Sequence, residues 1–251
     1  MNRPVVAIIQ ARMGSSRLPG KVLEPLMGEP LILRQLERVG RARELDGIVV
    51  ATSTDPRDDR LAEVVAAAGV PVHRGSELDV LERYRDAARE ARAQTIVRLT
   101  GDCPLIDPAV IDDVVLEARA SGAHFTSNSL AQTYPDGMDV EVFSREMLEL
   151  AAREARLPSE REHVTFYFWG SGRFRVHRVR SERPLPPMRL AVDYPEDLAM
   201  VRLVYERLAP ANPEFGLGDI AALVEELGET PNGHIVRNTG WRAALAQDRE
   251  A

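Results

Sequence analysis

Long apolar runs and paired cysteines are both missing from this chain of 251 residues. Its one cysteine, Cys103, cannot form an intrachain disulfide, which is typical of proteins in a reducing compartment. The apolar stretch near the N-terminus, Val5 to Ile9, is far too short to span a bilayer and lacks the cleavage site of a signal peptide. We therefore expect a cytoplasmic protein with no membrane partner.

A surplus of basic residues is missing as well. Lys and Arg number 32 and Asp and Glu number 39, which gives a formal net charge of -7. General affinity for nucleic acid needs a cationic surface, so the charge excludes that class of partner. The chain also lacks internal repeats and obvious linkers, and 44% of its residues are hydrophobic. We interpret residues 1–251 as a single domain with a sizeable core.

Apolar runs rich in β-branched residues alternate with amphipathic helices through the first half of the chain. The predicted strands are residues 5–9, 47–52, 70–72, 95–99 and 123–126. The predicted helices are residues 31–39, 58–68, 78–93 and 108–120. This alternation predicts an α/β fold, in which a mostly parallel, twisted sheet carries helices on both faces. Ligands of such sheets collect at the carboxyl ends of the strands.

The second half is less regular. A turn at residues 135–137 leads into a predicted strand through residue 143. Further strands are expected at residues 174–179 and 189–192, and helices at residues 144–155, 159–169, 195–208 and 218–227. We interpret residues 130–188 as a small lobe inserted between elements of the sheet. The tail after Pro231 gives no structural prediction.

The loop after the first predicted strand is strongly cationic. It reads Gln10-Ala11-Arg12-Met13-Gly14-Ser15-Ser16-Arg17-Leu18-Pro19-Gly20-Lys21. Three cations, two hydroxyls and two glycines that permit unusual φ angles predict a polyphosphate site. It is not a P-loop, because the spacing from Gly14 to Gly20 is one residue too long and Val22 stands where Ser or Thr would bind Mg²⁺. The alternative is a solvated basic loop whose glycines serve turns.

The same loop resembles the nucleotide-binding signature of the cytidylyltransferase family. The matching residues are Ile9-Gln10-Ala11-Arg12 and Ser16-Arg17-Leu18-Pro19-Gly20-Lys21. That family includes the CMP-KDO and CMP-sialic acid synthetases, and the resemblance is greatest to the branch of the spore coat polysaccharide biosynthesis protein F. It implies a Rossmann-like nucleotide-diphospho-sugar transferase fold, CTP as the nucleotide and a sugar or sugar acid as the acceptor. It also implies Mg²⁺ as cofactor and a homodimer formed through the middle lobe.

Two aspartates follow predicted strands and are candidate metal ligands. Carboxylates at the ends of two strands can converge on one Mg²⁺, which takes one or two protein carboxylates together with substrate phosphate oxygens. The family resemblance implies that Asp102 and Asp193 are these ligands. Asp193 could instead cap the helix that begins at Pro195, whereas Asp107 already serves as the cap of the helix after Asp102. Cys103 is expected to be a small buried packing residue.

The resemblance further implies the roles of individual site residues. Catalysis is assigned to Arg12, Lys21 and Asp102. Nucleotide contacts are expected from Gln10, Ala11, Arg12, Gly14, Ser15, Ser16, Arg17, Lys21, Thr52, Ser53, Arg74, Ser76, Thr100 and Gly101. Acceptor contacts are expected from Asp139, Glu141 and His163.

Structural alternatives exist for several of these residues. Helix capping explains Asp55 in the loop after the second strand, and Ser76 with Asp79 resembles a capping box. Asp139 and Glu141 could belong to a solvated strand face, since period-two alternation places them together. A lone histidine on a helix, such as His163, is often structural.

Three functions are compatible with these residues. In nucleotidyl transfer an acceptor hydroxyl attacks the α-phosphorus of a nucleoside triphosphate and pyrophosphate leaves, mainly through positioning and charge neutralisation. A glycosyltransferase that uses a nucleotide-sugar would usually carry a D-x-D metal motif, but Gly101-Asp102-Cys103 has one acid. A non-catalytic nucleotide-binding module would be expected to lose its metal-binding acids, and both are present. The sequence therefore favours nucleotidyl transfer.

Overall fold

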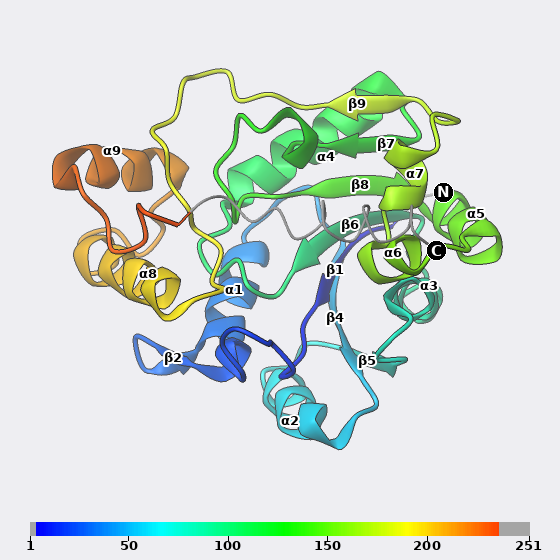
Figure 1. Ribbon diagram of the computed structural model, residues 1–251, viewed down its shortest axis with the longest axis horizontal. Coiled ribbons are helices and arrows are strands. Elements are labelled where there is room, and N and C mark those ends of the chain that lie inside the picture. The colour runs from blue at the N-terminus through cyan, green and yellow to red at the C-terminus, as the bar shows by residue number, and fades with distance from the viewer. Residues whose placement is uncertain (1–3, 236–251) are drawn as a thin grey trace.

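The computed structural model describes residues 4–235, and its centre is a seven-stranded sheet (Figure 1). The strand order is β5-β4-β1-β6-β8-β7-β9. These strands are β1 (Val5–Gln10), β4 (Gly47–Ser53), β5 (Val72–Gly75), β6 (Thr95–Thr100), β7 (Phe125–Ser127), β8 (Glu141–Ser144) and β9 (Val176–Arg178). β8 is antiparallel to both of its neighbours, and the other four pairs are parallel. The predicted mostly parallel α/β sheet is confirmed.

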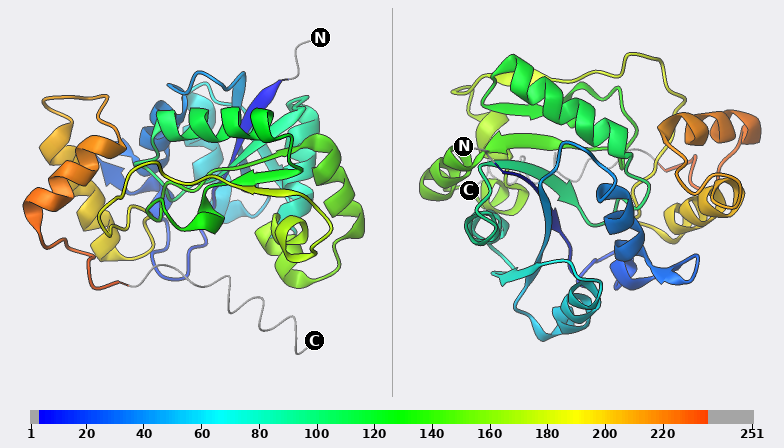
Figure 2. Two further views of the ribbon diagram at one scale, coloured as in Figure 1. Left: turned by 90° about the horizontal axis from the view of Figure 1, so that it is seen from above. Right: turned by 180° about the vertical axis from the view of Figure 1, so that it is seen from behind.

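Helices cover both faces of this sheet (Figure 2). They are α1 (Leu31–Val39), α2 (Asp59–Ala67), α3 (Val80–Glu90), α4 (Pro108–Ser121), α5 (Arg145–Glu154), α6 (Pro158–His163), α7 (Phe166–Gly170), α8 (Pro195–Leu208) and α9 (Leu217–Leu227). Three short 3-10 turns are η1 (Lys21–Leu23), η2 (Pro56–Asp58) and η3 (Ser129–Ala131), and a hairpin of β2 (Pro25–Leu26) and β3 (Glu29–Pro30) lies outside the main sheet.

The side chains of β1 alternate between two apolar cores. Val5, Ala7 and Ile9 join the core that contains residues of α1, α2, α4, α8 and α9. Val6 and Ile8 join the core that contains residues of α3, α5 and α7. Because β1 is buried on both faces, its sequence is a continuous apolar run rather than an alternating one. This central position fixes the loop after β1 at the carboxyl edge of the sheet.

Most predicted elements are confirmed, and α1 and α8 have the predicted bounds. The prediction of one helix over residues 159–169 is wrong, because α6 ends before Val164, whose φ is 60°. Val164 is fully buried, and the Thr165 hydroxyl donates to Glu141 Oε1 at 3.0 Å. These tertiary contacts outweigh the helix preference of the segment. The strand predicted at 70–72 begins instead at Val72, after Pro71.

Residues 189–192 make one isolated β-bridge, between Arg189 and Asp136, but do not form the predicted strand. Leu190 N donates to Asp136 O at 2.7 Å, and Val192 N donates to Asp102 O at 2.8 Å. The segment therefore bonds to two loops at the carboxyl edge of the sheet instead of pairing along a neighbouring strand. This path brings the start of α8 to the end of β6.

Residues 130–188 form part of the main sheet. They contribute β8, which lies between β6 and β7, and β9 at the edge, while α5, α6 and α7 pack beside them. The division of the chain into one domain with an inserted lobe stays a prediction, and the end of the tail, residues 236–251, lies outside the described residues.

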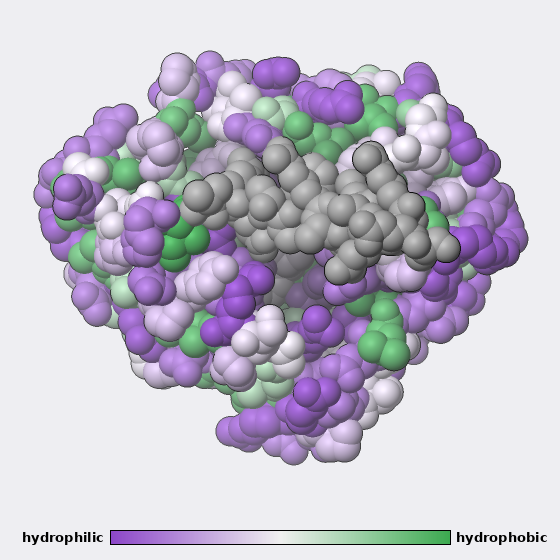
Figure 3. Space-filling view, viewed as in Figure 1, coloured by the Kyte–Doolittle hydropathy of each residue, from purple (hydrophilic) through white to green (hydrophobic). Residues whose placement is uncertain are grey.

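Polar side chains predominate on the face of the molecule that Figure 3 shows outside the grey atoms. On the face seen in Figure 3, hydrophilic side chains cover the region of α2 and the outer ends of the molecule, and apolar side chains are scattered in small areas. No helix within residues 4–235 has the length and apolar character needed to cross a membrane.

Candidate functional site

Two aspartates that are far apart in the sequence meet at one lysine amine. Lys21 Nζ lies 3.0 Å from Asp102 Oδ2 and 3.0 Å from Asp193 Oδ1, and it donates to the carbonyl of Val192 at 2.6 Å. Lys21 begins η1 after the cationic loop, Asp102 follows β6, and Asp193 precedes α8. Both candidate metal ligands therefore lie within hydrogen-bonding distance of the candidate catalytic lysine.

Close backbone contact at Gly101 holds the ends of β1 and β6 together. Gly101 N donates to Gln10 O at 2.8 Å. A Cβ added to Gly101 would lie 2.7 Å from the Cβ of Ala11, so a larger residue does not fit. The two residues that flank Gly101 also contact each other, since the Thr100 hydroxyl donates to Asp102 Oδ1 at 2.6 Å. These contacts fix the direction in which Asp102 leaves the strand.

Asp193 accepts from cations on both of its oxygens. Oδ1 lies 2.7 Å from Arg17 and 3.0 Å from Lys21, and Oδ2 lies 2.6 Å from Arg189. The alternative that Asp193 caps α8 is wrong, because Tyr194 is the N-cap residue. Asp197, in the first turn of the helix, accepts from the backbone N–H groups of Asp193 at 2.9 Å and Tyr194 at 3.0 Å. The carboxylate of Asp193 is therefore committed to side-chain cations.

These ion pairs shift the pKa values of three groups. Burial lowers the pKa of Lys21, but the two carboxylates outweigh burial and raise it above its ordinary value of 10.5. Burial raises the pKa of Asp193, but Lys21 and Arg17 outweigh burial and lower it to about 2. Burial also raises the pKa of Asp102, and Lys21 again reverses the shift and lowers it. The cluster is therefore fully charged at neutral pH.

The lowered pKa of Asp193 predicts a loss of stability in acid. A carboxylate with a folded pKa of about 2 and an ordinary pKa of 3.8 stabilises the fold fully above the ordinary value, and this contribution is lost as the pH falls towards the folded value. In urea unfolding, the free-energy difference between the wild type and Asp193→Asn should shrink by about 1 kcal/mol from about pH 5 to about pH 3. A constant difference over this range would contradict the ion pairing.

The cationic loop folds back on itself. Met13 O accepts from Ser15 N and from Gly20 N, each at 2.9 Å, and Met13 N donates to Asp58 Oδ1 at 2.7 Å. Gly20 has a φ of 74°, in the left-handed region that glycine adopts without strain, whereas Gly14 has no positive φ. The loop thus needs one glycine for its turn.

Three polar residues of this loop are exposed, namely Arg12, Ser16 and Arg17. Arg12 forms no ion pair with another residue of the part of the chain that the structure describes. Arg17 pairs with Asp193 and lies 5.2 Å from the centroid of the Tyr194 ring. The loop therefore offers two exposed arginines and, at its end, the buried amine of Lys21.

The residues at the ends of β4 and β5 shape the neighbouring loops. Thr52 and Ser53 are fully buried, and the Ser53 hydroxyl donates to Asp58 Oδ2 at 2.5 Å. Arg74 lies inside β5 rather than after it, and it donates to the carbonyls of Ser53 at 2.9 Å and Asp55 at 3.0 Å. Because Asp58 also binds the cationic loop, these side chains connect the loop after β4 to that loop. Neither Thr52 nor Ser53 is at the surface.

Capping roles hold at two positions in these loops. Asp55 accepts from Arg57 N at 2.8 Å and caps η2. Ser76 accepts from Asp79 N at 3.0 Å, but Asp79 itself caps α3 by accepting from Glu82 N at 2.9 Å. The expectation that Ser76 caps α3 is wrong, because the cap is Asp79, three residues later. The contact of Ser76 with a nucleotide stays a prediction.

One pocket of about 320 Å³ contains both candidate metal ligands and all three predicted acceptor residues in its wall. These five residues are Asp102, Asp193, Asp139, Glu141 and His163. They come from the end of β6, the start of α8, the approach to β8, β8 itself and the end of α6. The fold therefore places the predicted metal ligands and the predicted acceptor residues around the same pocket.

Glu141 is buried and already engaged by other side chains. Its Oε2 accepts from Arg98 at 2.5 Å, and its Oε1 accepts from Thr165 at 3.0 Å. Arg98 also donates to Gln10 Oε1 at 3.0 Å. The alternative of a solvated strand face is wrong for Glu141. A hydrogen-bonded chain instead runs from the end of β1 across β6 to β8 and the start of α7.

Sequence reasoning missed an aromatic wall of this pocket. Phe166 and Trp169 line it together with His163. The His163 ring stacks on Phe166 with centroids 4.5 Å apart, and Phe166 meets Trp169 edge to face at 4.9 Å. Phe166 and Trp169 could have been found from the sequence, because a spacing of three residues places both rings on one side of α7, whereas His163 belongs to α6.

The donor chemistry at the two aspartates fits a divalent cation that arrives with a nucleotide. Within residues 4–235 no three His, Cys, Asp or Glu side chains form a group that could hold a metal ion by themselves. Mg²⁺ needs only one or two protein carboxylates, because water and phosphate oxygens complete its shell. Asp102 and Asp193 supply such hard oxygen ligands.

Comparisons with known proteins identify chains that are similar to this one. A family model described as cytidylyltransferase matches residues 6–214. The chain is 32% identical over 228 residues to the spore coat polysaccharide biosynthesis protein SpsF of Bacillus subtilis, covering 88% of this chain and 93% of that relative. It is 37% identical over 183 residues to a 3-deoxy-manno-octulosonate cytidylyltransferase of Anaeromyxobacter dehalogenans, covering 66% and 73%.

A solved structure of a cytidylyltransferase from Leptospira borgpetersenii has the same fold. Its TM-score is 0.84 at 33% identity, covering 95% of this chain and 98% of that one.

Proposed function

The chain belongs to the cytidylyltransferase family, and we propose that it transfers CMP from CTP to a sugar or sugar acid with release of pyrophosphate. The observation that carries this proposal is the contact of Lys21 with Asp102 and Asp193, two carboxylates that line one pocket. The name of the Bacillus subtilis relative supports a role in making polysaccharide precursors, and the 3-deoxy-manno-octulosonate relative supports a sugar-acid acceptor.

The cationic loop would hold the triphosphate. Arg12 is exposed, and Arg17 and Lys21 now pair with Asp193, so phosphate oxygens would compete with that carboxylate for the same cations. In the reaction the acceptor oxygen bonds to the α-phosphorus, the bond from that phosphorus to the pyrophosphate oxygen breaks, and the hydroxyl proton passes to solvent water. Fixed cations accelerate such a transfer by positioning the phosphates and neutralising their charge.

A divalent cation, proposed to be Mg²⁺, would be held by Asp102 and Asp193 and would polarise the α-phosphate. The pocket beyond these residues would bind the acceptor. Carboxylates such as Asp139 accept hydrogen bonds from sugar hydroxyls, and the rings of Phe166 and Trp169 offer an apolar surface to the carbon face of a sugar. The proposal further includes a homodimer through residues 130–188, by family resemblance, and a cytoplasmic location, which the single cysteine favours.

Pyrophosphate release tests the proposal. Purified protein would be mixed with Mg²⁺, one of CTP, UTP, GTP or ATP, and each of a panel of sugars and sugar acids. Pyrophosphate should appear with CTP, and CTP should raise the thermal unfolding temperature more than the other nucleotides. No pyrophosphate across the panel together with no nucleotide binding would overturn the proposal. A glycosyltransferase would instead release a nucleoside diphosphate from a nucleotide-sugar.

A further inference from the structure

A buried arginine outside the predicted site binds three carboxylates. Arg189 donates through Nε to Asp197 Oδ1 at 2.9 Å, through Nη2 to Asp193 Oδ2 at 2.6 Å, and through Nη1 to Asp136. All three donor atoms of one guanidinium are thus committed in a fixed fork. Arg189 is not among the site residues predicted from the sequence.

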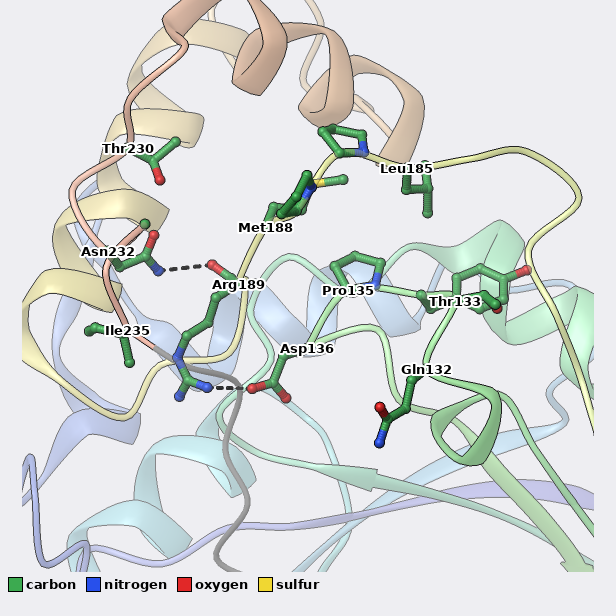
Figure 4. A pocket seen from close by; sticks show the side chains of 14 residues that line it. Gln132, Thr133, Pro135, Asp136, Leu185, Met188, Arg189, Thr230, Asn232 and Ile235 are labelled. Carbon is green, nitrogen blue, oxygen red and sulfur yellow. Dashed lines mark hydrogen bonds and ion pairs between the residues drawn. The ribbon is translucent and has the colours of Figure 1, made fainter.

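A second layer of hydrogen bonds fixes this arginine. Asn232, which follows α9, donates to the carbonyl of Arg189 at 2.9 Å and to Asp197 Oδ1 at 2.8 Å. Both Asn232 and Asp197 are buried. Figure 4 shows Arg189 reaching towards Asp136, and Asn232 reaching towards the Arg189 carbonyl, in the wall of a second pocket of about 320 Å³.

The two oxygens of Asp193 have different partners. Oδ2 accepts from Arg189, a buried residue that lies on the side of the second pocket. Oδ1 is held by Lys21 and by the exposed Arg17, the cations that the proposed function assigns to the phosphates. Oδ1 is therefore the oxygen that ligand binding can expose, while Oδ2 keeps its partner.

We propose that Arg189 is a positioning residue, which orients the Asp193 carboxylate so that Oδ1 points to the site. This inference rests on the proposed function, because it concerns how Asp193 serves the cation and nucleotide. Arg189 would act through Asp193 and would touch neither substrate. Hydrogen-bond partners behind a metal-binding side chain commonly change metal affinity by about 10- to 100-fold when removed.

Binding measurements separate positioning from simple support of the fold. The dissociation constant of CTP is measured by calorimetry once in Mg²⁺ and once in EDTA. The constant in EDTA divided by the constant in Mg²⁺ is the ratio that reports the contribution of the cation. In Arg189→Lys, one ammonium cannot replace three donors in a plane. We expect this ratio to fall by about 10-fold or more, while the CTP affinity in EDTA changes little.

Two further variants keep the test decisive. Asn232→Ala removes the outer hydrogen bonds and should lower the same ratio by about threefold, even if Arg189→Lys folds poorly. Arg207→Met, on the exposed side of α8 and paired with Glu226, is the matched control and should leave the ratio unchanged. A lower unfolding temperature with an unchanged ratio in both test variants would overturn the inference. A wild type that binds no CTP would instead overturn the proposed function.

Discussion

Replacing Lys21 with methionine should lower kcat/KM by about 10²- to 10³-fold and destabilise the fold by about 3 kcal/mol. The amine of Lys21 is buried and is shared by Asp102 and Asp193, so its loss leaves two neighbouring carboxylates without the cation between them. The same substitution removes one of the charges proposed to hold the triphosphate. Initial rates of pyrophosphate release and urea unfolding measure the two effects.

A double variant separates these two effects. Adding Asp102→Asn to Lys21→Met removes one of the facing carboxylates and should recover part of the lost stability but none of the activity. The exposed Arg60, paired with Glu63 on α2, provides the control variant Arg60→Met, which should change neither quantity. If Lys21→Met were as stable as the wild type at neutral pH, the charge arrangement described for the site would be incorrect.

Lys21 also provides a spectroscopic probe, because it is the only lysine in the chain. Lysine labelled with ¹³C therefore gives a single side-chain Cε signal, and that signal belongs to the site. Adding CTP with Mg²⁺ should shift it. An ammonium is a compact charge that fits between two carboxylates and a carbonyl, whereas a guanidinium is planar and larger. Lys21→Arg is accordingly expected to be nearly as inactive as Lys21→Met.

Asp102→Asn is expected to reduce turnover by about 10³-fold with little change in the fold. The amide has the shape of the carboxylate and can still accept the Thr100 hydrogen bond, but it carries no charge for a divalent cation. Lys21 keeps its contact with Asp193. Circular dichroism and unfolding would show a stability within about 1 kcal/mol of the wild type, while pyrophosphate release nearly disappears.

A cation titration completes this test. Raising the Mg²⁺ concentration should not restore the rate of Asp102→Asn, because the lost ligand charge cannot be replaced by occupancy alone. The matched variant Asp112→Asn removes a carboxylate on α4 that binds the backbone of residues 43 and 44 far from the pocket, and it should keep full activity. Activity of Asp102→Asn close to that of the wild type would remove Asp102 from the proposed mechanism.

The elements that the sequence predicted well are those fixed by local patterns. β1 is a continuous apolar run because both of its faces are buried, and α1 and α8 have helical spacing of apolar residues. Asp107 precedes a proline at the first turn of α4 and accepts from Ala109 N at 2.8 Å, as a cap should. The positions of Asp102 and Lys21 follow from the ends of such elements.

Features that depend on distant contacts could not be predicted in this way. Nothing local in residues 141–144 shows that β8 enters the sheet antiparallel between β6 and β7. Gly137 has a φ of 101°, and a Cβ there would lie 2.5 Å from the backbone nitrogen of Ala191, more than fifty residues later. The path of residues 189–192, and with it the carboxylate network of Arg189, depends on that contact.

The place of β8 in the sheet has a consequence for motion. Arg98 of β6 and Glu141 of β8 are opposite each other in the strand register and are joined by an ion pair in the pocket. The proposed nucleotide side and the proposed acceptor side thus lie on adjacent hydrogen-bonded strands, so a hinge between them would have to break the hydrogen bonds between β6 and β8. Under the proposed function, closure around bound substrates would therefore come from the flanking loops and short helices, where acceptor preference could change without altering the end of β6.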